Sequence, residues 1–166
     1  MAEETGSQAP QRGAEHERLS VFLGKWHAEG KSYAAGQTKD NPRGAVEKWV
    51  SDETFEWLSG QFFMLQRWDA MTGANAFKGV AIVSCDPEKG NYTTRSYENH
   101  GFVRDYATSV DGDVWTFAGD FERARVEFTD GGDTQKIGWE WRKAGEDWLP
   151  LCDRVAKRVN NNLVIR

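Results

Sequence analysis

Residues 45–69 read AVEKWVSDETFEW, LSGQ and FFMLQRWD, two strand-like runs joined by a short turn. Polar and apolar side chains alternate in the first run, with the period of a β-strand and not of a helix. Gly60 lies in the connection, and a short glycine-containing link between two such runs predicts a β-hairpin. The segment therefore indicates antiparallel β-structure.

The same pattern recurs along the chain and predicts about ten strands, separated by turns rich in Gly, Asn, Asp and Pro. Parallel connections would need intervening helices, and none is evident. The hairpin succession favours an all-β, up-and-down antiparallel barrel, because closure removes exposed sheet edges. A two-sheet sandwich with a solid core is the alternative. The expected strands are Lys25–Tyr33, Ala45–Trp57, Phe62–Asp69, Phe77–Asp86, Tyr92–Glu98, Phe102–Val110, Val114–Phe117, Glu122–Thr129, Gln135–Arg142 and Trp148–Val159.

One amphipathic helix is predicted at the N-terminal side, over Ala14–Leu23, because Leu19, Phe22 and Leu23 recur at helical spacing. Such a helix would plug one end of a barrel. Residues 1–13 are polar and are expected to form a disordered leader, and residues 160–166 a frayed tail. The chain of 166 residues is thus interpreted as one barrel domain over residues 14–159.

Composition disfavours several classes of partner. The chain has 21 Lys and Arg against 26 Asp and Glu, and the formal net charge of −5 disfavours binding to nucleic acid or to an anionic membrane. No apolar run approaches the roughly 20 residues that span a bilayer. The polar first residues show no secretory signal. We therefore expect a cytoplasmic protein that binds a small hydrophobic ligand, and neither nucleic acid nor membrane.

The sequence carries no recognisable catalytic, phosphate-binding or metal-binding motif. Cys85 and Cys152 lie in separate apolar runs without a neighbouring base, which is typical of buried structural thiols. A zinc site needs more ligands at suitable spacing than two cysteines and three histidines offer. We therefore expect no metal and no cofactor, and we assign no catalytic residue.

Several stretches resemble known barrel families. FLGKWHAEG, residues 22–30, is similar to the Leu-Xaa-Gly-Xaa-Trp-Xaa-Gly-Xaa-Gly opening of nitrobindin-type, calycin-like barrels. A longer ordered set resembles the lipocalin-like family called domain of unknown function 1579, and the resemblance covers residues 15–158. It implies a ten-stranded antiparallel barrel with an internal cavity and no settled activity. The similar stretches are His16–Leu19, Gly24–Trp26, Phe55–Gly60, Arg67–Asp69, Asp86–Pro87, Trp115–Phe117 and Trp139–Trp141.

The nitrobindin resemblance also implies a haem held by a histidine near the C-terminal end of the barrel. This chain departs from that pattern, because it has no histidine after His100. Haem binding is therefore disfavoured, unless the fold brings His100 to the same pocket.

The aromatic residues point to the ligand site. Eight tryptophans and nine phenylalanines are spread over the expected strands, as in a barrel lined with aromatic rings. In lipocalin-like barrels the tryptophan at the position of Trp26 packs across the closed end, and Arg154 is its expected cation–π partner. The residues predicted to bind the ligand are Trp49, Phe62, Met64, Trp68, Tyr97, His100, Trp115 and Trp139.

The sequence leaves open which face of several strands points inward. If Trp68 faces the cavity, Arg67 faces solvent, because neighbouring side chains point to opposite sides. Glu140 faces water if the tryptophans on either side of it face inward. Interior arginines and tyrosines would suit a carboxylate ligand, whereas charges that alternate along a strand more often mark a solvated face. The candidates for such interior positions are Arg104, Tyr106, Arg123 and Arg125.

Three functions follow as alternatives. The first is binding of a small apolar or amphipathic organic molecule in the cavity. The second is an enzyme, an isomerase, cyclase or hydrolase acting on a hydrophobic substrate, with His100, Tyr97 and Glu140 as candidate titratable groups. His100 and Tyr97 cluster with Asn99 at a loop end, where an exposed turn histidine is the alternative. The third is a homodimer formed through the strand that begins with Phe62, which has apolar residues on both faces.

Overall fold

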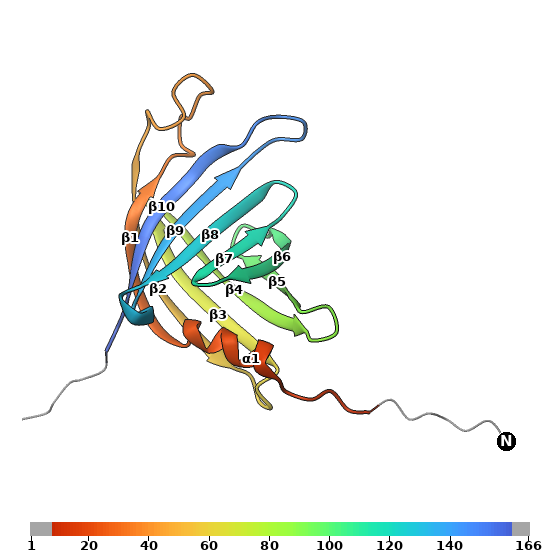
Figure 1. Ribbon diagram of the computed structural model, residues 1–166. Coiled ribbons are helices and arrows are strands. Elements are labelled where there is room, and N and C mark those ends of the chain that lie inside the picture. Colours follow the sequence, from red (N-terminus) through yellow and green to blue (C-terminus); the bar gives the residue numbers. More distant parts are fainter. Residues whose placement is uncertain (1–7, 161–166) are drawn as a thin grey trace, which may run out of the picture.

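Ten strands close into one antiparallel barrel in the computed structural model, which describes residues 8–160 (Figure 1). Each strand pairs with the next in sequence, and the last pairs with the first. The barrel predicted from the sequence is confirmed, and the sandwich is excluded. The strands are β1 (Gly24–Ser32), β2 (Glu47–Trp57), β3 (Phe63–Thr72), β4 (Asn75–Asp86), β5 (Asn91–Glu98), β6 (Val103–Asp111), β7 (Val114–Ala118), β8 (Glu122–Thr129), β9 (Thr134–Trp141) and β10 (Leu149–Arg158).

The N-terminal helix is shorter than the sequence pattern predicts. An α-helix, α1, covers Ala14–Arg18, and a 3₁₀-helix, η1, covers Leu19–Phe22. The chain then turns directly into β1 at Gly24, whose φ of +111° is a conformation that glycine adopts without strain. The predicted leader at residues 1–13 and tail at residues 160–166 lie mostly outside the described residues.

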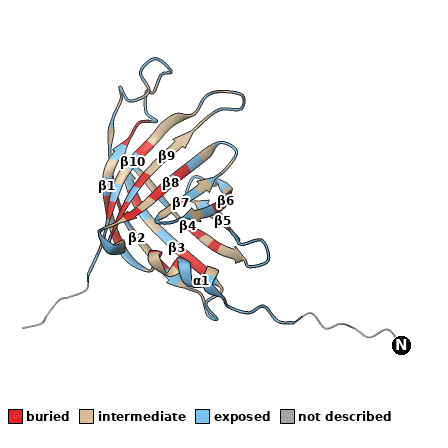
Figure 2. Ribbon diagram, viewed as in Figure 1, coloured by how far each residue is buried: buried red, intermediate tan, exposed pale blue. Residues whose placement is uncertain are grey.

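α1 and η1 cover one end of the barrel, at the bottom of Figure 1. The β2–β3, β4–β5, β6–β7 and β8–β9 turns lie at that same end, because consecutive antiparallel strands reverse direction. Leu19 and Phe22 of η1 are 0% and 4% exposed and belong to the main hydrophobic cluster. Figure 2 shows buried and exposed positions mixed along most strands, as expected of walls with an inner and an outer face. The two helices, called the plug below, therefore form part of the core.

A tryptophan–arginine pair fastens the plug to the strands. The Arg158 guanidinium lies 4.3 Å from the ring centroid of Trp26, which is 1% exposed. The Trp26 indole donates a hydrogen bond of 2.8 Å to the Phe22 carbonyl. Arg158 also pairs with Asp133 at 2.8 Å, and it donates to the backbone carbonyls of Val21, Leu23 and Gly132.

The prediction that Arg154 partners Trp26 is wrong. Arg158 takes that place, and the Arg154 guanidinium lies instead 4.6 Å from the ring centroid of Trp49. The two arginines are four residues apart on β10 and share its inner face. At about 3.3 Å per residue, Arg154 is therefore about 13 Å further towards the other end of the barrel.

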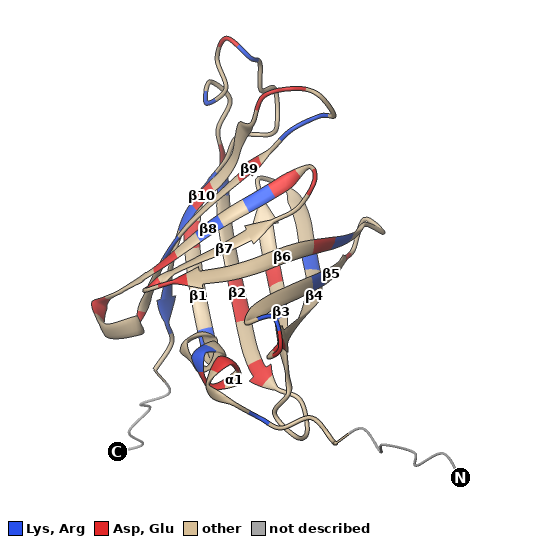
Figure 3. Ribbon diagram, turned by 45° about the vertical axis from the view of Figure 1, so that its right-hand side comes forward, with Lys and Arg blue, Asp and Glu red and all other residues tan. Residues whose placement is uncertain are grey.

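Charged residues occur along several strands (Figure 3), and the exposed ones among them lie on the outer walls of the barrel. Two arginines proposed as interior candidates belong there: Arg123 pairs with Glu140, and Arg125 pairs with Glu127 at 3.0 Å. Arg67 is also exposed, and it lies 3.9 Å from Glu56. Among the described residues, no helix has the length and apolar character needed to cross a membrane.

Candidate functional site

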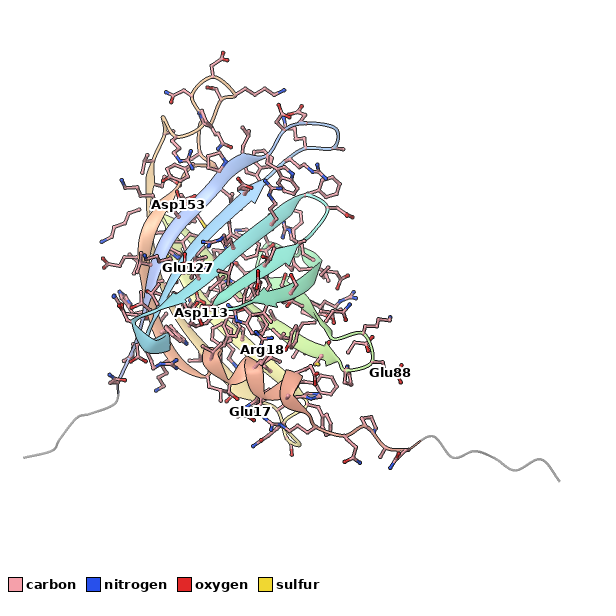
Figure 4. All side chains as sticks on the ribbon, viewed as in Figure 1. Glu17, Arg18, Glu88, Asp113, Glu127 and Asp153 are labelled. Atoms are coloured by element: carbon pink, nitrogen blue, oxygen red, sulfur yellow. The ribbon has the colours of Figure 1, made fainter. Side chains whose placement is uncertain are left out.

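The barrel contains a cavity of about 330 Å³ along its axis. Phe22 of η1 lies at the plugged end of this cavity, and His100 of the β5–β6 loop lies at the opposite end, the mouth. Among the side chains drawn in Figure 4, Glu17 and Arg18 mark the plugged end and Asp153 marks β10 nearer the mouth. The volume is in the range of sites that hold small organic molecules.

The part of the cavity near the plug is apolar and aromatic. Phe22 is at its centre, with ring centroids 5.2 Å from Phe55 and 5.0 Å from Trp115. A ligand surface placed here would be removed from water, which favours apolar groups by roughly 25 cal/mol per Å². The apolar residues that line this part include Leu19, Phe22, Phe55, Val83, Trp115 and Phe117.

A buried ion pair lies in the cavity wall. Arg154 Nη2 on β10 is 3.3 Å from Glu53 Oε1 on β2, and the side chains are 10% and 3% exposed. Gln66 Nε2 donates to Glu53 Oε2 at 3.1 Å, and the Ser51 hydroxyl donates to Glu53 Oε1 at 3.2 Å. The Trp49 indole donates to Ser51 at 3.0 Å. Glu53 thus has several donors and neutralises the charge of Arg154, as a buried carboxylate requires.

Gly30 makes room for this ion pair. β1 lies between β10 and β2, and Gly30 is the β1 residue paired with both Arg154 and Trp49. A Cβ at Gly30 would lie 2.1 Å from the Asp153 carbonyl oxygen and 2.6 Å from Arg154 Cα and Cβ. Any other residue there would displace β10. This glycine is the last residue of the FLGKWHAEG stretch. A glycine is needed at the end of that stretch because β10 packs against it without room for a side chain.

Gly79 on β4 leaves room for the Trp68 ring, as Gly30 leaves room for Arg154. A Cβ at Gly79 would lie 2.3 Å from Cζ2 of Trp68 and 2.4 Å from the Tyr97 carbonyl oxygen. The Trp68 indole therefore lies over β4, where its ring centroid is 5.6 Å from that of Phe77. Glycine at this position gives the indole a place in the cavity wall.

Three buried side-chain nitrogens lack a hydrogen-bond partner within the described residues, and all three belong to residues that line the cavity. They are Trp68 Nε1, Gln135 Nε2 and Arg154 Nε. Buried donors without partners are uncommon in folded proteins, and a bound molecule or ordered water is the usual explanation. The cavity wall therefore contains three unsatisfied buried donors.

A second polar cluster lies nearer the mouth. Arg104 Nε on β6 is 3.3 Å from Glu122 Oε2 on β8, and the Tyr106 hydroxyl donates to the same oxygen at 2.9 Å. Burial, together with the neighbouring Glu122 charge, raises the pKa of Tyr106 well above its usual value. Tyr106 therefore stays protonated at neutral pH. Arg104 and Tyr106 both line the cavity. Of the two alternatives from the sequence, an interior position and a solvated strand face, this pair occupies the interior position.

The mouth carries a carboxylate–histidine pair. Glu98, whose side chain is 3% exposed, lies 2.7 Å from His100 Nδ1 and accepts hydrogen bonds from the backbone amides of His100 and Phe102. Burial acts to raise the pKa of Glu98, but the hydrogen bonds from His100 and Phe102 outweigh it, and the pKa is lowered. The His100 ring stacks on Phe77 with centroids 6.3 Å apart. The histidine is thus held at the rim of the cavity, with its side chain 53% exposed.

The cavity brings together five of the eight predicted ligand-binding residues: Trp49, Trp68, His100, Trp115 and Trp139. The other three do not line it. Tyr97 is 45% exposed on the outer face, Met64 is fully buried within the core cluster, and Phe62 precedes β3 and packs edge-on against His16. The candidate titratable residues Tyr97 and Glu140 therefore lie outside the cavity.

Sequence reasoning missed the buried ion pair between Glu53 and Arg154. Glu53 shares the inner face of β2 with Trp49 and Phe55, and a carboxylate within an apolar face is a signal of a buried pair. Arg154 stands between Cys152 and Ala156 on an equally buried face of β10. Both faces of β5 contain polar residues, so the sequence pattern did not show which face points into the barrel. The prediction that Tyr97 faces the cavity is wrong, because its side chain is on the outer face.

The two cysteines behave as structural thiols. Cys152 is 3% exposed, and burial raises its pKa to about 11. Cys85 is half-buried, and burial likewise raises its pKa. Both therefore stay protonated at neutral pH. Over residues 8–160, no group of three or more His, Cys, Asp and Glu side chains is placed to hold a metal ion.

Known proteins show the same architecture. The model of the family described as "Protein of unknown function (DUF1579)" matches residues 11–146. The chain belongs to this family. No curated protein matches this DUF1579 chain.

Two solved structures resemble this member of the DUF1579 family. Rv2717c from M. tuberculosis is 14% identical, with a TM-score of 0.63 over 90% of this chain and 100% of that one. The S-type phycobiliprotein lyase CPES from Guillardia theta is also 14% identical, with a TM-score of 0.55 over 91% of this chain and 99% of that one. At this identity the likeness establishes the fold, a calycin-like barrel, and no more.

Proposed function

We propose that this protein binds a small apolar or amphipathic organic molecule inside the barrel. The observation that carries the proposal is the cavity of about 330 Å³, plugged at one end and lined mainly by aromatic and aliphatic side chains. Apolar burial would supply most of the affinity, and a few fixed polar groups would orient the ligand. Entry would occur at the mouth, beside His100.

A lyase or another enzyme acting on a hydrophobic substrate is the second candidate. One of the structural neighbours is named a phycobiliprotein lyase, and a barrel of this form therefore suits an enzyme as well as a carrier. The feature that favours it here is the Arg104–Glu122–Tyr106 cluster, because it places a carboxylate and a protonated phenol side by side in the cavity wall. Of the titratable candidates from the sequence, His100 alone lines the cavity.

Haem fits the site poorly. His16 and His27 do not line the cavity, and His100 lies at its rim, with the side chain 53% exposed. The Cys152 thiol does line the cavity, but with a pKa of about 11 it is not a thiolate at neutral pH. Because the one histidine of the described residues that lines the cavity lies at its rim, we propose a ligand other than haem.

Filling the cavity tests the binding proposal. Ala81 on β4 lines the cavity and is 2% exposed, so Ala81→Phe should place a ring in the space that the ligand needs. We expect the affinity for ethylnaphthalene, measured by fluorescence titration, to fall at least about tenfold, at a cost of about 1–3 kcal/mol in stability. Ala107→Phe on the exposed face of β6 is the matched control and should bind normally. Undiminished binding by a folded Ala81→Phe variant would contradict the proposal.

We also propose a cytoplasmic protein that forms a homodimer. The supporting feature for the dimer is the outer face of β3, where Phe63 and Met71 are 47% and 42% exposed. Light scattering over a dilution series distinguishes monomer from dimer.

A further inference from the structure

The barrel wall lacks backbone pairing near the mouth, between β6 and the β7–β8 turn. β7 is the shortest of the described strands, and its pairing with β6 ends at Ala107 and Ala118. Residues 103–106 of β6 continue towards the mouth, and no strand in the described part of the chain pairs with them on that side. At about 3.3 Å per residue, this unpaired stretch is about 13 Å long. Figure 3 shows the start of β6 apart from the β7–β8 turn, and we call this place the pairing gap.

Three side chains cross the pairing gap in place of backbone hydrogen bonds. Arg104 Nε on β6 lies 3.3 Å from Oε2 of Glu122, the first residue of β8, and the Tyr106 hydroxyl donates to the same oxygen at 2.9 Å. The Tyr106 ring also packs against Gly119 in the turn, where an added Cβ would lie 3.1 Å from Cδ1 of the ring. Arg104, Tyr106 and Glu122 all line the cavity, so these side chains separate its interior from the pairing gap.

The Arg104–Glu122 ion pair is a weak closure. The two side chains are 30% and 22% exposed, so water partly screens their attraction. Separating them breaks no backbone hydrogen bond, whereas opening the wall between two paired strands would break a ladder of such bonds. The wall therefore opens more easily at the pairing gap than between strands that are paired.

Two exposed aromatic rings flank the pairing gap. Phe102, which precedes β6 and lines the cavity, is 57% exposed, and the Arg104 guanidinium lies 4.4 Å from its ring centroid. Phe121, which directly precedes Glu122, is 55% exposed. An apolar molecule that approaches this part of the mouth would therefore contact apolar surface before it reaches the ion pair.

From this arrangement we infer that the Arg104–Glu122 pair is a latch on ligand exchange: an apolar molecule enters and leaves the cavity through the pairing gap when the pair separates. The inference rests on the proposed binding function and deepens it by naming the step that limits exchange. A latch that closes over both the empty and the loaded barrel must open for entry and for exit. It therefore controls the rate constants of association and dissociation more than it controls the affinity.

Stopped-flow fluorescence with ethylnaphthalene as the probe measures both rate constants. Glu122→Gln removes the ion pair but keeps an acceptor for the Tyr106 hydroxyl, so association and dissociation should both accelerate at least about threefold. The dissociation constant should change by a smaller factor than either rate constant. Arg104→Gln removes the same ion pair from the other side and should accelerate exchange to a similar extent, so the test does not depend on the folding of one variant.

A double variant and a control attribute the effect to the pair. Arg104→Gln/Glu122→Gln should accelerate exchange no more than either single variant, because each single change already breaks the latch. Glu127→Gln removes a carboxylate that pairs with Arg125 on the outer face of β8, and it should leave both rate constants unchanged. Far-ultraviolet circular dichroism confirms that each variant is folded.

The outcomes separate the inference from the function on which it rests. Unchanged rate constants in the folded single variants would overturn the inference, and so would accelerations that multiply in the double variant. Faster dissociation without faster association would also overturn it, because the pair would then hold the ligand and not the entrance. Each of these results would leave the proposed binding function intact. Failure of the unmodified protein to bind ethylnaphthalene would contradict the binding function itself.

Discussion

Glu53→Leu should lower the free energy of unfolding by about 3 kcal/mol, because it leaves the Arg154 guanidinium buried without a counter-charge. The side chains of the pair are only 3% and 10% exposed, so solvent screens the lost interaction weakly. We place the effect at the lower end of the usual 3–5 kcal/mol for a broken buried pair, since Arg154 can recruit water through the cavity. Urea denaturation followed by tryptophan fluorescence measures the change.

The double variant Glu53→Leu/Arg154→Met tests whether the unpaired Arg154 charge causes this loss of stability. It replaces both charges with apolar groups of similar size and should recover more than half of the lost stability, because no unpaired charge remains. A double variant no more stable than Glu53→Leu would show that the pair is not the source of the effect. A loss below about 1 kcal/mol for Glu53→Leu alone would have the same meaning.

Gly30→Ala should cost about 3 kcal/mol, although alanine ordinarily stabilises a strand relative to glycine. The new Cβ would lie 2.1 Å from the Asp153 carbonyl oxygen, and this contact is with backbone that cannot move without disturbing the β1–β10 pairing. Because Arg154 lies over the same glycine, ligand binding should weaken as well.

Gly138→Ala on β9 is the matched control for Gly30→Ala. Its nearest neighbour, Asp153 Oδ1, would be 3.4 Å from the added Cβ, which is an ordinary contact. We expect it to change stability by less than about 0.5 kcal/mol in the same denaturation experiment. Equal effects of the two alanine substitutions would argue that general loss of glycine, and not the close approach at Gly30, determines stability.

The strand order followed from the sequence because local signals define it. Glycines that turn the chain, such as Gly73 with φ of +57° and Gly112 with φ of +57°, stand between alternating runs and leave little freedom in where a strand ends. With all connections short, an up-and-down barrel was the natural topology, and the predicted strands agree with the observed ones to within a few residues.

The sequence did not predict the buried polar site, because that site depends on contacts between strands that are distant in the chain. Nothing local links Glu53 to Arg154, and their meeting requires both barrel closure at β1 and the missing side chain of Gly30. Arg154 and Arg158 have the same parity on β10, so the sequence could not tell which of them reaches Trp26. The choice depends on barrel register, which long-range pairing sets.

Native mass spectrometry after incubation with acetylnaphthalene tests the central claim, that the barrel cavity holds a small molecule. The account predicts a complex heavier than the 18.8 kDa chain by one acetylnaphthalene, lost on denaturation and much reduced in Ala81→Phe. A co-purified ligand would give a similar excess before incubation and should be displaced by the probe. The bare chain mass throughout, or an adduct equally abundant in Ala81→Phe, would contradict the account.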